Sequence, residues 1–219
     1  YTALAFEKTR AKFPAYLCET LRAFFQTLRP YIQDESIAAM VDAIDTDPDR
    51  LVEYLLQKDA SAALVRTTTA ATMAQASPAP NVLPQQANMV FNFRTMPGES
   101  IAYVLERVRQ AAHACHVEVS LIKGMEASEV SRFDTDAYAL LCDAIQAFFP
   151  TSVAAPYVLT GATDARYFEE ICECVYRFRP FIAEMEAKET VHAANERLDT
   201  YSYIHGVKFF TYLMEKACS

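Results

Sequence analysis

The sequence predicts an α/β protein in three parts: a helical N-terminal part, a small antiparallel sheet, and a C-terminal part in which helices and strands alternate. Three observations support this prediction. Residues 1–60 carry apolar side chains at helical spacing, residues 65–122 follow the order strand, strand, helix, strand, and both patterns alternate beyond residue 127. An antiparallel sheet of this size is expected to carry its helices on one face.

Composition narrows the class of protein. The chain has 219 residues, of which 52% are hydrophobic and 22% are charged, so it is expected to fold around a sizeable core. The formal net charge is -8 and the basic residues are scattered, which argues against nucleic acid as a partner. No apolar run approaches the roughly 20 residues needed to cross a bilayer, so no membrane contact is evident. The six cysteines contain no CxxC pair, which argues against a thiolate zinc site.

Three helices are expected within the first 60 residues. Apolar side chains recur at helical spacing over 17–28 and again over 37–44, and Pro30 separates the two patterns. Asp47 and Pro48 predict the start of the third helix. An Asp at the N-cap accepts a free amide, and a Pro at the first helical position has no N–H to satisfy. No residue here suggests chemistry, so these helices are interpreted as a packed insertion.

The middle of the chain is predicted to form a sheet. Residues 65–76 are rich in β-branched side chains, and residues 86–95 alternate between apolar and polar, so each is expected to form a strand. A turn over 97–100 precedes a helix that contains Val104. A further strand is expected over 116–122.

The C-terminal part alternates between the two patterns. A helix is predicted over 138–148 and another from Ala165, with short strands over 155–159 and 174–178. A terminal helix contains His205, which is interpreted as structural.

Four segments carry the chemical signal. In chain order they are Asn81-Val82-Leu83-Pro84, Asn92-Phe93-Arg94-Thr95-Met96-Pro97-Gly98, Gly161-Ala162-Thr163-Asp164-Ala165-Arg166 and His192-Ala193-Ala194-Asn195-Glu196-Arg197. Because it contains these four segments in this order, the chain resembles the dinuclear-zinc peptidase family of aminoacylase, glutamate carboxypeptidase and succinyl-diaminopimelate desuccinylase. Residues 65–70, 175–178 and the helical insertion point to the branch of Gly-X carboxypeptidase and N-acyl amino acid synthase/hydrolase.

The resemblance implies a fold and a division into domains. Residues 1–126 would form a ferredoxin-like lid or dimerisation domain, including a helical insertion at 1–62. Residues 127–219 would form the C-terminal α/β segment of a catalytic domain that holds two zinc ions. The family's remaining metal ligands and its general base come from segments that have no counterpart here. The chain is therefore expected to lack the N-terminal catalytic half and to be inactive alone, and a homodimer through the lid is expected.

The same resemblance assigns His192 as a zinc ligand and Asn81 as a contact of the reacting oxygen. A neutral imidazole suits zinc, and a side-chain amide can stabilise an oxyanion. This chain would supply at most one ligand of the two-zinc site. Asn81 is equally compatible with a simple turn residue.

Four further residues are implied to hold a substrate carboxylate: Arg94, Gly161, Thr163 and Arg166. An arginine presents a planar fork of donors that matches a carboxylate, and backbone amides at a turn before a helix can add to it. Alternatives remain for each arginine, because Arg94 also suits a solvated strand face and Arg166 can simply pack.

The turn around Gly161 departs from the family pattern. The family often has two glycines there, whereas this chain has Ala162 at the second position. An alanine would be unfavourable if that position required a positive φ. Asp164, two residues further on, is interpreted as a helix cap rather than a metal ligand.

The resemblance therefore predicts a zinc-dependent hydrolase that cleaves an amide bond next to a free carboxylate, in small peptides or N-acyl amino acids. The alternative is a non-catalytic dimerisation or ligand-binding module. The acyl group, the amino-acid preference and the compartment are not determined by the sequence.

Overall fold

A computed structural model describes residues 13–113, 117–181 and 194–219. The chain divides into two compact units. The first comprises Tyr1–Glu129 and Tyr157–Ala162, and the second comprises Val130–Pro156 and Thr163–Ser219. Among the described residues, no helix combines the length and the apolarity that crossing a bilayer requires.

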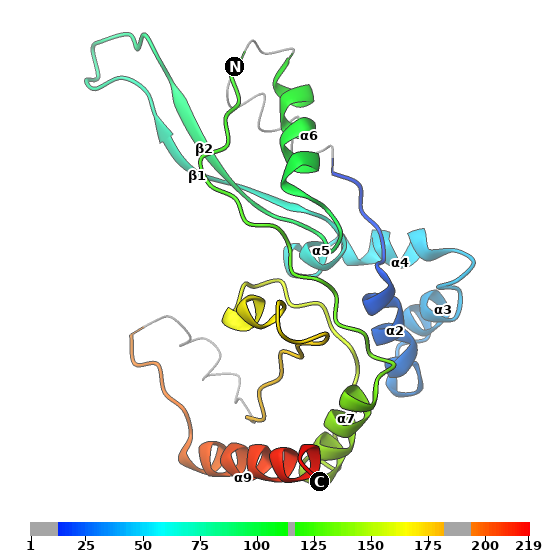
Figure 1. The fold of residues 1–219 in the computed structure, drawn as a ribbon. Helices are drawn as coiled ribbons and strands as arrows, with labels where there is room; N and C mark the ends of the chain where they lie inside the picture. The colour runs from blue at the N-terminus through cyan, green and yellow to red at the C-terminus, as the bar shows by residue number, and fades with distance from the viewer. Residues whose placement is uncertain (1–12, 114–116, 182–193) are drawn as a thin grey trace. The chain divides into compact units, whose positions relative to one another are not determined.

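The described part of the first unit opens with short helices joined by tight connections. They are α2 (Glu19–Leu28), η1 (Arg29–Tyr31), α3 (Glu35–Asp42), α4 (Pro48–Leu55) and α5 (Asp59–Val65) (Figure 1). The three helices predicted here are confirmed as α2, α3 and α4, and Pro30 follows the end of α2. Asp34 starts α3, because its carboxylate accepts the amides of Ser36 at 2.8 Å and Ile37 at 3.2 Å.

The prediction for the start of α4 is confirmed in one respect and wrong in another. Pro48 occupies the first turn as predicted, but the Asp47 side chain accepts no capping hydrogen bond. With Pro48 in that turn, one of the free N–H groups is already missing, so the need for a side-chain cap is smaller.

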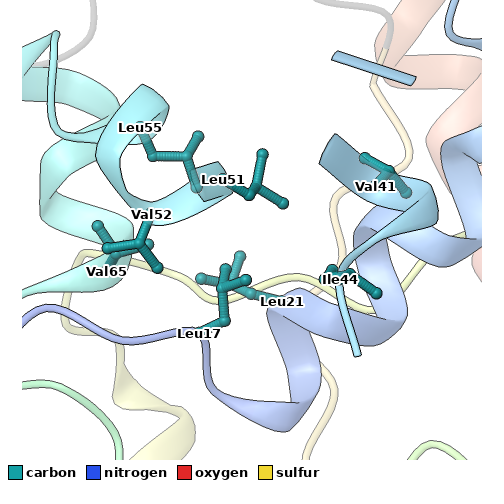
Figure 2. Packing of buried hydrophobic residues seen from close by; sticks show 8 residues of the cluster. All are labelled: Leu17, Leu21, Val41, Ile44, Leu51, Val52, Leu55 and Val65. Atoms are coloured by element: carbon teal, nitrogen blue, oxygen red, sulfur yellow. The ribbon is translucent and has the colours of Figure 1, made fainter. Parts of the chain in front are cut away.

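These helices enclose the main apolar core of the first unit. Eight buried side chains meet between them (Figure 2), namely Leu17, Leu21, Val41, Ile44, Leu51, Val52, Leu55 and Val65. Val158, from the distant segment Tyr157–Ala162, packs against the same cluster, and the Tyr157 ring lies 5.2 Å from that of Phe24. The core therefore holds this segment in place.

The predicted strand over 65–76 begins later than expected. Residues up to Val65 belong to α5, and the strand β1 runs over Thr68–Gln75. Alanine favours helix, and burial of Val65 in the core outweighs its preference for a strand.

β1 pairs with β2 (Asn88–Arg94) in an antiparallel hairpin (Figure 1). The pairing runs from Thr68 opposite Arg94 to Gln75 opposite Asn88, with a register shift between Ala71 and Met73. β2 confirms the strand predicted over 86–95. The following helix, α6 (Ile101–His113), confirms the helix predicted around Val104.

The strand predicted over 116–122 is wrong for the described part, residues 117–122, which have no regular structure. Leu121 and Ile122 are exposed there, at 53% and 77%, and have no neighbouring strand to pair with. In the described residues the sheet is therefore two-stranded, and a full ferredoxin-like arrangement is not seen.

The described part of the second unit is built on two helices that pack side by side, α7 (Asp136–Phe148) and α9 (Thr200–Ala217) (Figure 1). Both confirm predicted helices. Leu141, Ala144 and Phe209 form the buried cluster between them. Partly buried aromatic side chains surround it, and the Phe209 ring lies 5.2 Å from that of Phe178 and 5.5 Å from that of Phe148.

Three other C-terminal predictions are wrong. No strand forms over 155–159 or 174–178, and the helix expected from Ala165 is only the 3-10 turn η2 (Asp164–Phe168). At Val175 the Ser131 hydroxyl takes the place of a neighbouring strand. It accepts the Val175 N–H at 2.9 Å and donates to the Val175 carbonyl at 3.1 Å.

Candidate substrate-binding site

Arg94 is the predicted site residue whose surroundings are best defined. It is exposed at the end of β2, and its Nη1 donates to the Thr160 carbonyl oxygen at 3.1 Å. Thr160 belongs to the segment Tyr157–Ala162, which the core of the first unit already anchors through Val158. The structure thus brings Arg94 to the residue that immediately precedes Gly161.

A tight turn follows Arg94 and gives its strand a defined end. The Glu99 amide donates to the Met96 carbonyl at 3.1 Å, with Pro97 and Gly98 as the two central residues. Gly98 has φ +84°, which an L side chain rarely adopts. Proline second and a positive-φ glycine third are typical of a type II turn. An added Cβ at Gly98 would meet nothing within 4 Å, so glycine is required here for its backbone conformation alone.

Buried polar contacts hold this turn against β1. The Thr67 hydroxyl accepts the Met96 amide at 2.9 Å and donates to the Glu99 carboxylate. The Tyr16 hydroxyl donates to the Pro97 carbonyl at 3.3 Å. Burial, followed by the nearby Glu99 carboxylate, raises the pKa of Tyr16 to about 12, so Tyr16 remains a donor at neutral pH.

The backbone around Gly161 answers the concern about Ala162. Among the described residues, positive φ occurs at Gly98 and Asn195, so neither Gly161 nor Ala162 adopts it. Ala162 therefore carries no penalty of that kind. Gly161 is exposed, and an added Cβ there would meet nothing within 4 Å.

Thr163 and Arg166 form a separate local arrangement in the second unit. The Thr163 side chain accepts the Ala165 amide at 3.3 Å, and Arg166 Nε donates to the Thr163 carbonyl at 3.1 Å. The helix cap is therefore Thr163, and the prediction that Asp164 caps the turn is wrong by one residue. Asp164 instead lies in the first turn, where an acidic side chain interacts favourably with the free backbone amides.

Asn81 lies in the exposed connection between β1 and β2. The Val82 amide donates to the Ala79 carbonyl at 3.3 Å, which makes Asn81 the third residue of a turn. This geometry fits the turn interpretation of Asn81. Its role at a reacting oxygen stays a prediction.

The predicted zinc ligand His192 lies outside the described residues. Within 13–113, 117–181 and 194–219, no three His, Cys, Asp or Glu side chains are grouped closely enough to hold a metal. The described residues therefore offer no donor set for zinc.

Residues on either side of 182–193 contact α9 or cap it. Phe181 contacts Gly206, where an added Cβ would come within 3.0 Å of ring carbon Cδ1, and Asp199 caps the helix by accepting the Ser202 amide at 2.7 Å. Asn195 has φ 63°, a conformation that asparagine tolerates better than most residues.

His205 lies in α9 as predicted, with its ring 5.4 Å from that of Phe148 and 5.0 Å from that of Phe149. Its Nδ1 is buried without a hydrogen-bond partner among the described residues. These aromatic contacts fit the structural interpretation of His205.

Thr67 and Glu99 were not among the predicted site residues. Their signals were present, because Thr67 lies in the threonine-rich run and Glu99 directly follows the Pro-Gly pair. What the sequence did not show was that the two meet across 32 positions.

Comparison with known families defines the class. Residues 18–216 match the family described as Peptidase family M20/M25/M40, so the chain belongs to this family of zinc-dependent peptidases and amidohydrolases. The family resemblance predicted from the four segments is therefore confirmed.

Several curated proteins are similar to the chain. Probable carboxypeptidase S-like 2 of Dictyostelium discoideum is 33% identical, over 70% of the chain and 30% of the relative. N-fatty-acyl-amino acid synthase/hydrolase PM20D1 of Homo sapiens is 33% identical, over 71% and 32%. Carboxypeptidase S of Saccharomyces cerevisiae is 24% identical, over 74% and 33%. The chain thus spans about a third of the length of these relatives. No solved structure matches it.

Proposed function

We propose that the chain is part of a zinc-dependent hydrolase that cleaves an amide bond next to a free carboxylate, in small peptides or N-acyl amino acids. Membership of the peptidase family supports the hydrolytic reaction. Two relatives, carboxypeptidase S and N-fatty-acyl-amino acid synthase/hydrolase, are named for substrates that carry a free carboxylate. That shared group supports the proposed substrate class.

The observation that carries this proposal is the state of Arg94. The side chain is exposed, it forms no ion pair among the described residues, and a single hydrogen bond from Nη1 to Thr160 fixes one side of the guanidinium. The rest of the fork remains available for two parallel bonds to a carboxylate. A tethered arginine also loses less side-chain entropy when it binds such a group.

Other residues take the roles that the sequence predicts. Gly161, Thr163 and Arg166 add donors to the carboxylate, Asn81 contacts the reacting oxygen, and His192 serves as a zinc ligand. A bound zinc supplies Lewis-acid polarisation and an activated water. The described residues hold no group of three His, Cys, Asp or Glu side chains that would complete such a site.

The proposed domain assignment follows the same family pattern. Residues 1–126 form the lid, with a ferredoxin-like sheet and a helical insertion at 1–62, and residues 127–219 belong to the catalytic domain. A homodimer through the lid is part of the proposal. With a single candidate zinc ligand, the isolated chain is expected to show no turnover of N-acyl amino acids.

The test replaces Arg94 by lysine in the full-length protein. Arg94→Lys keeps the charge but loses the planar fork, so kcat/KM for a free-acid substrate should fall by about 5- to 150-fold, equivalent to about 1–3 kcal/mol. The matching carboxamide should be unaffected. Arg109→Lys, at an exposed position on α6, is the matched control and should leave both substrates unchanged.

Asn81→Ala separates the second role. It should lower kcat for the acid and the amide alike, because its proposed partner becomes charged only in the transition state. Equal losses by the Arg94 and Asn81 variants on both substrates would contradict the division of roles. If the full-length protein also bound no zinc, a ligand-binding or dimerisation module would be the better description.

A further inference from the structure

We propose that Thr67 and Glu99 form a buried latch that positions Arg94 for carboxylate recognition. The inference rests on the proposed function of Arg94 and deepens it, because it adds two positioning residues that do not touch the substrate. The Thr67–Glu99 latch is defined by these two side chains and by the Met96 amide bound to Thr67.

The latch is buried, and its two hydrogen bonds share the Thr67 hydroxyl. Thr67 is 3% exposed and Glu99 9%, and the adjacent Met96 is 2% exposed. A threonine hydroxyl has one hydrogen to donate, and here it goes to the Glu99 carboxylate while the oxygen accepts the Met96 amide. The Thr67 side chain, one residue before β1, therefore binds both ends of the turn over 96–99 that follows β2.

The place of the latch in the strand ladder connects it to Arg94. Thr68 pairs with Arg94 at the end of the β1–β2 ladder, and Thr67 is the next residue along the chain. Beyond Arg94 the ladder offers no further pairs, so the turn over 96–99 determines where β2 ends. By fixing that turn against β1, the latch prevents the last pair of the ladder from fraying.

Loss of the latch would change the orientation of the Arg94 guanidinium. A two-point bond between guanidinium and carboxylate depends on the orientation of the fork, and a displacement of about 1 Å can cost much of its effect. If the end of β2 frays, Arg94 also loses its fixed distance to Thr160. We therefore expect loss of the latch to weaken binding of the carboxylate specifically, with little effect on steps that do not involve it.

The chemistry of Glu99 fits this role. Its carboxylate accepts from Thr67, whereas other groups bind the free amides at the start of α6. The Ser100 hydroxyl accepts the Tyr103 amide at 3.1 Å, and the Glu126 carboxylate accepts the Ile101 amide at 2.9 Å. Removing the Thr67 hydroxyl would leave a buried carboxylate and a buried amide without their partner, a cost that the ladder end must absorb.

The experiment uses the full-length protein and four variants in two matched pairs. Thr67→Val and Glu99→Met keep side-chain volume and abolish the hydrogen bond, whereas Thr67→Ser and Glu99→Gln retain it. KM and kcat are measured for a free-acid substrate and its carboxamide. The two breaking variants should raise KM for the acid about 10-fold and leave the carboxamide within about 2-fold. The two conservative variants should stay within about 2-fold of the parent on both substrates.

A double-mutant cycle with Arg94→Lys gives the decisive readout. Because the latch acts through Arg94, Thr67→Val should add less than about 2-fold to the KM for the acid in the Arg94→Lys background. Equal losses on acid and amide, or full additivity with Arg94→Lys, would overturn the proposal.

The remaining outcomes are also decisive. If Arg94→Lys discriminates between acid and amide while the breaking variants do not, the latch proposal fails and the function of Arg94 stands. If Arg94→Lys itself shows no discrimination, the proposed function fails. If neither breaking variant folds, as judged by its melting curve, the latch is a folding determinant and the positioning role is overturned.

Discussion

The helices α2–α5 and the helix pair α7–α9 bury their apolar side chains to very different extents. In the described part of the first region, eight buried residues drawn from several elements meet in one cluster. In the second, the cluster comprises Leu141, Ala144 and Phe209, and partly buried rings surround it. α9 also leaves many large apolar side chains exposed, namely Tyr201, Tyr203, Ile204, Val207, Phe210 and Met214.

This difference teaches that the two regions depend on their cores in different ways. Stabilisation in the first is spread over many contacts, so the loss of one side chain leaves most of the cluster intact. In the described part of the second, fewer buried side chains share it, and Phe209 is the largest of them. A contiguous apolar surface on a helix is also a site where further polypeptide can pack. Four substitutions would test this contrast, and the first has the largest expected effect.

The largest loss is expected from Phe209→Ala. Phe209 is 0% exposed and its ring contacts those of Phe148, Phe149 and Phe178, so truncation should cost about 3–5 kcal/mol and empty the cluster. Hydrogen exchange should show α7 and α9 losing protection together while α2–α5 keep theirs. Tyr203→Ala, at a position of α9 that is 56% exposed, is the control and should change little. Retained protection of α7 and α9 would contradict the contrast.

Leu21→Ala tests the larger core. Leu21 is 0% exposed, so its truncation should cost about 2–5 kcal/mol, measured as the change in unfolding free energy in urea. Exchange should nevertheless show residual protection across α4 and α5, because the other members of the cluster still meet. Leu83→Ala, at a position 91% exposed, should have no measurable effect. Complete loss of protection in all four helices would show that this core is no more tolerant than that of the second unit.

Gly206→Ala probes packing in the second region. The added Cβ would collide with the Phe181 ring, at a cost of about 1–3 kcal/mol, and the gain in helix propensity of about 1 kcal/mol offsets only part of it. The melting temperature should therefore fall. Phe181→Leu combined with Gly206→Ala should recover part of the loss, because the smaller side chain makes room. A rise in melting temperature for Gly206→Ala alone would show that the ring moves aside freely.

Gly98→Ala isolates a backbone effect in the first region and should be the smallest of the four. The positive φ disfavours alanine by about 1–2 kcal/mol, and reduced freedom of the unfolded chain returns about 0.4–1 kcal/mol. Gly161→Ala is the matched control, since Gly161 has open space around it and no positive φ. It should be neutral or slightly stabilising, and a loss equal to that of Gly98→Ala would contradict this account.

The helices could be predicted from the sequence because their signals are local. Apolar spacing and start signals lie within each segment, as for Pro48 at the start of α4 and for the apolar spacing of α2 and α7. The short helix ending at Val65 was missed because seven residues carry little periodicity. The strands predicted over 116–122, as far as it is described, and over 174–178 are wrong because a strand needs a neighbour, and nothing within a short segment shows whether one exists.

The candidate site divides in the same way. Arg94 and the Pro-Gly turn after it are visible as a motif, so they could be predicted. The contact between Arg94 and Thr160 joins residues 66 positions apart, and no local pattern reports it. The Thr67–Glu99 contact is hidden for the same reason. Local motifs therefore predict the identity of candidate residues, whereas their long-range partners depend on the tertiary structure.

The register shift in the hairpin has an evolutionary consequence. Thr72 has no partner in the ladder between Ala71 and Met73, and its hydroxyl donates to the Val90 carbonyl at 3.2 Å instead. The extra residue separates the base of the hairpin, where Arg94 is paired, from the tip that carries Asn81. Insertions or deletions at the tip can then accumulate in descendants without shifting the base by one residue and turning Arg94 to the opposite face. The proposed roles of Asn81 at the tip and of Arg94 at the base therefore depend on separate parts of the ladder.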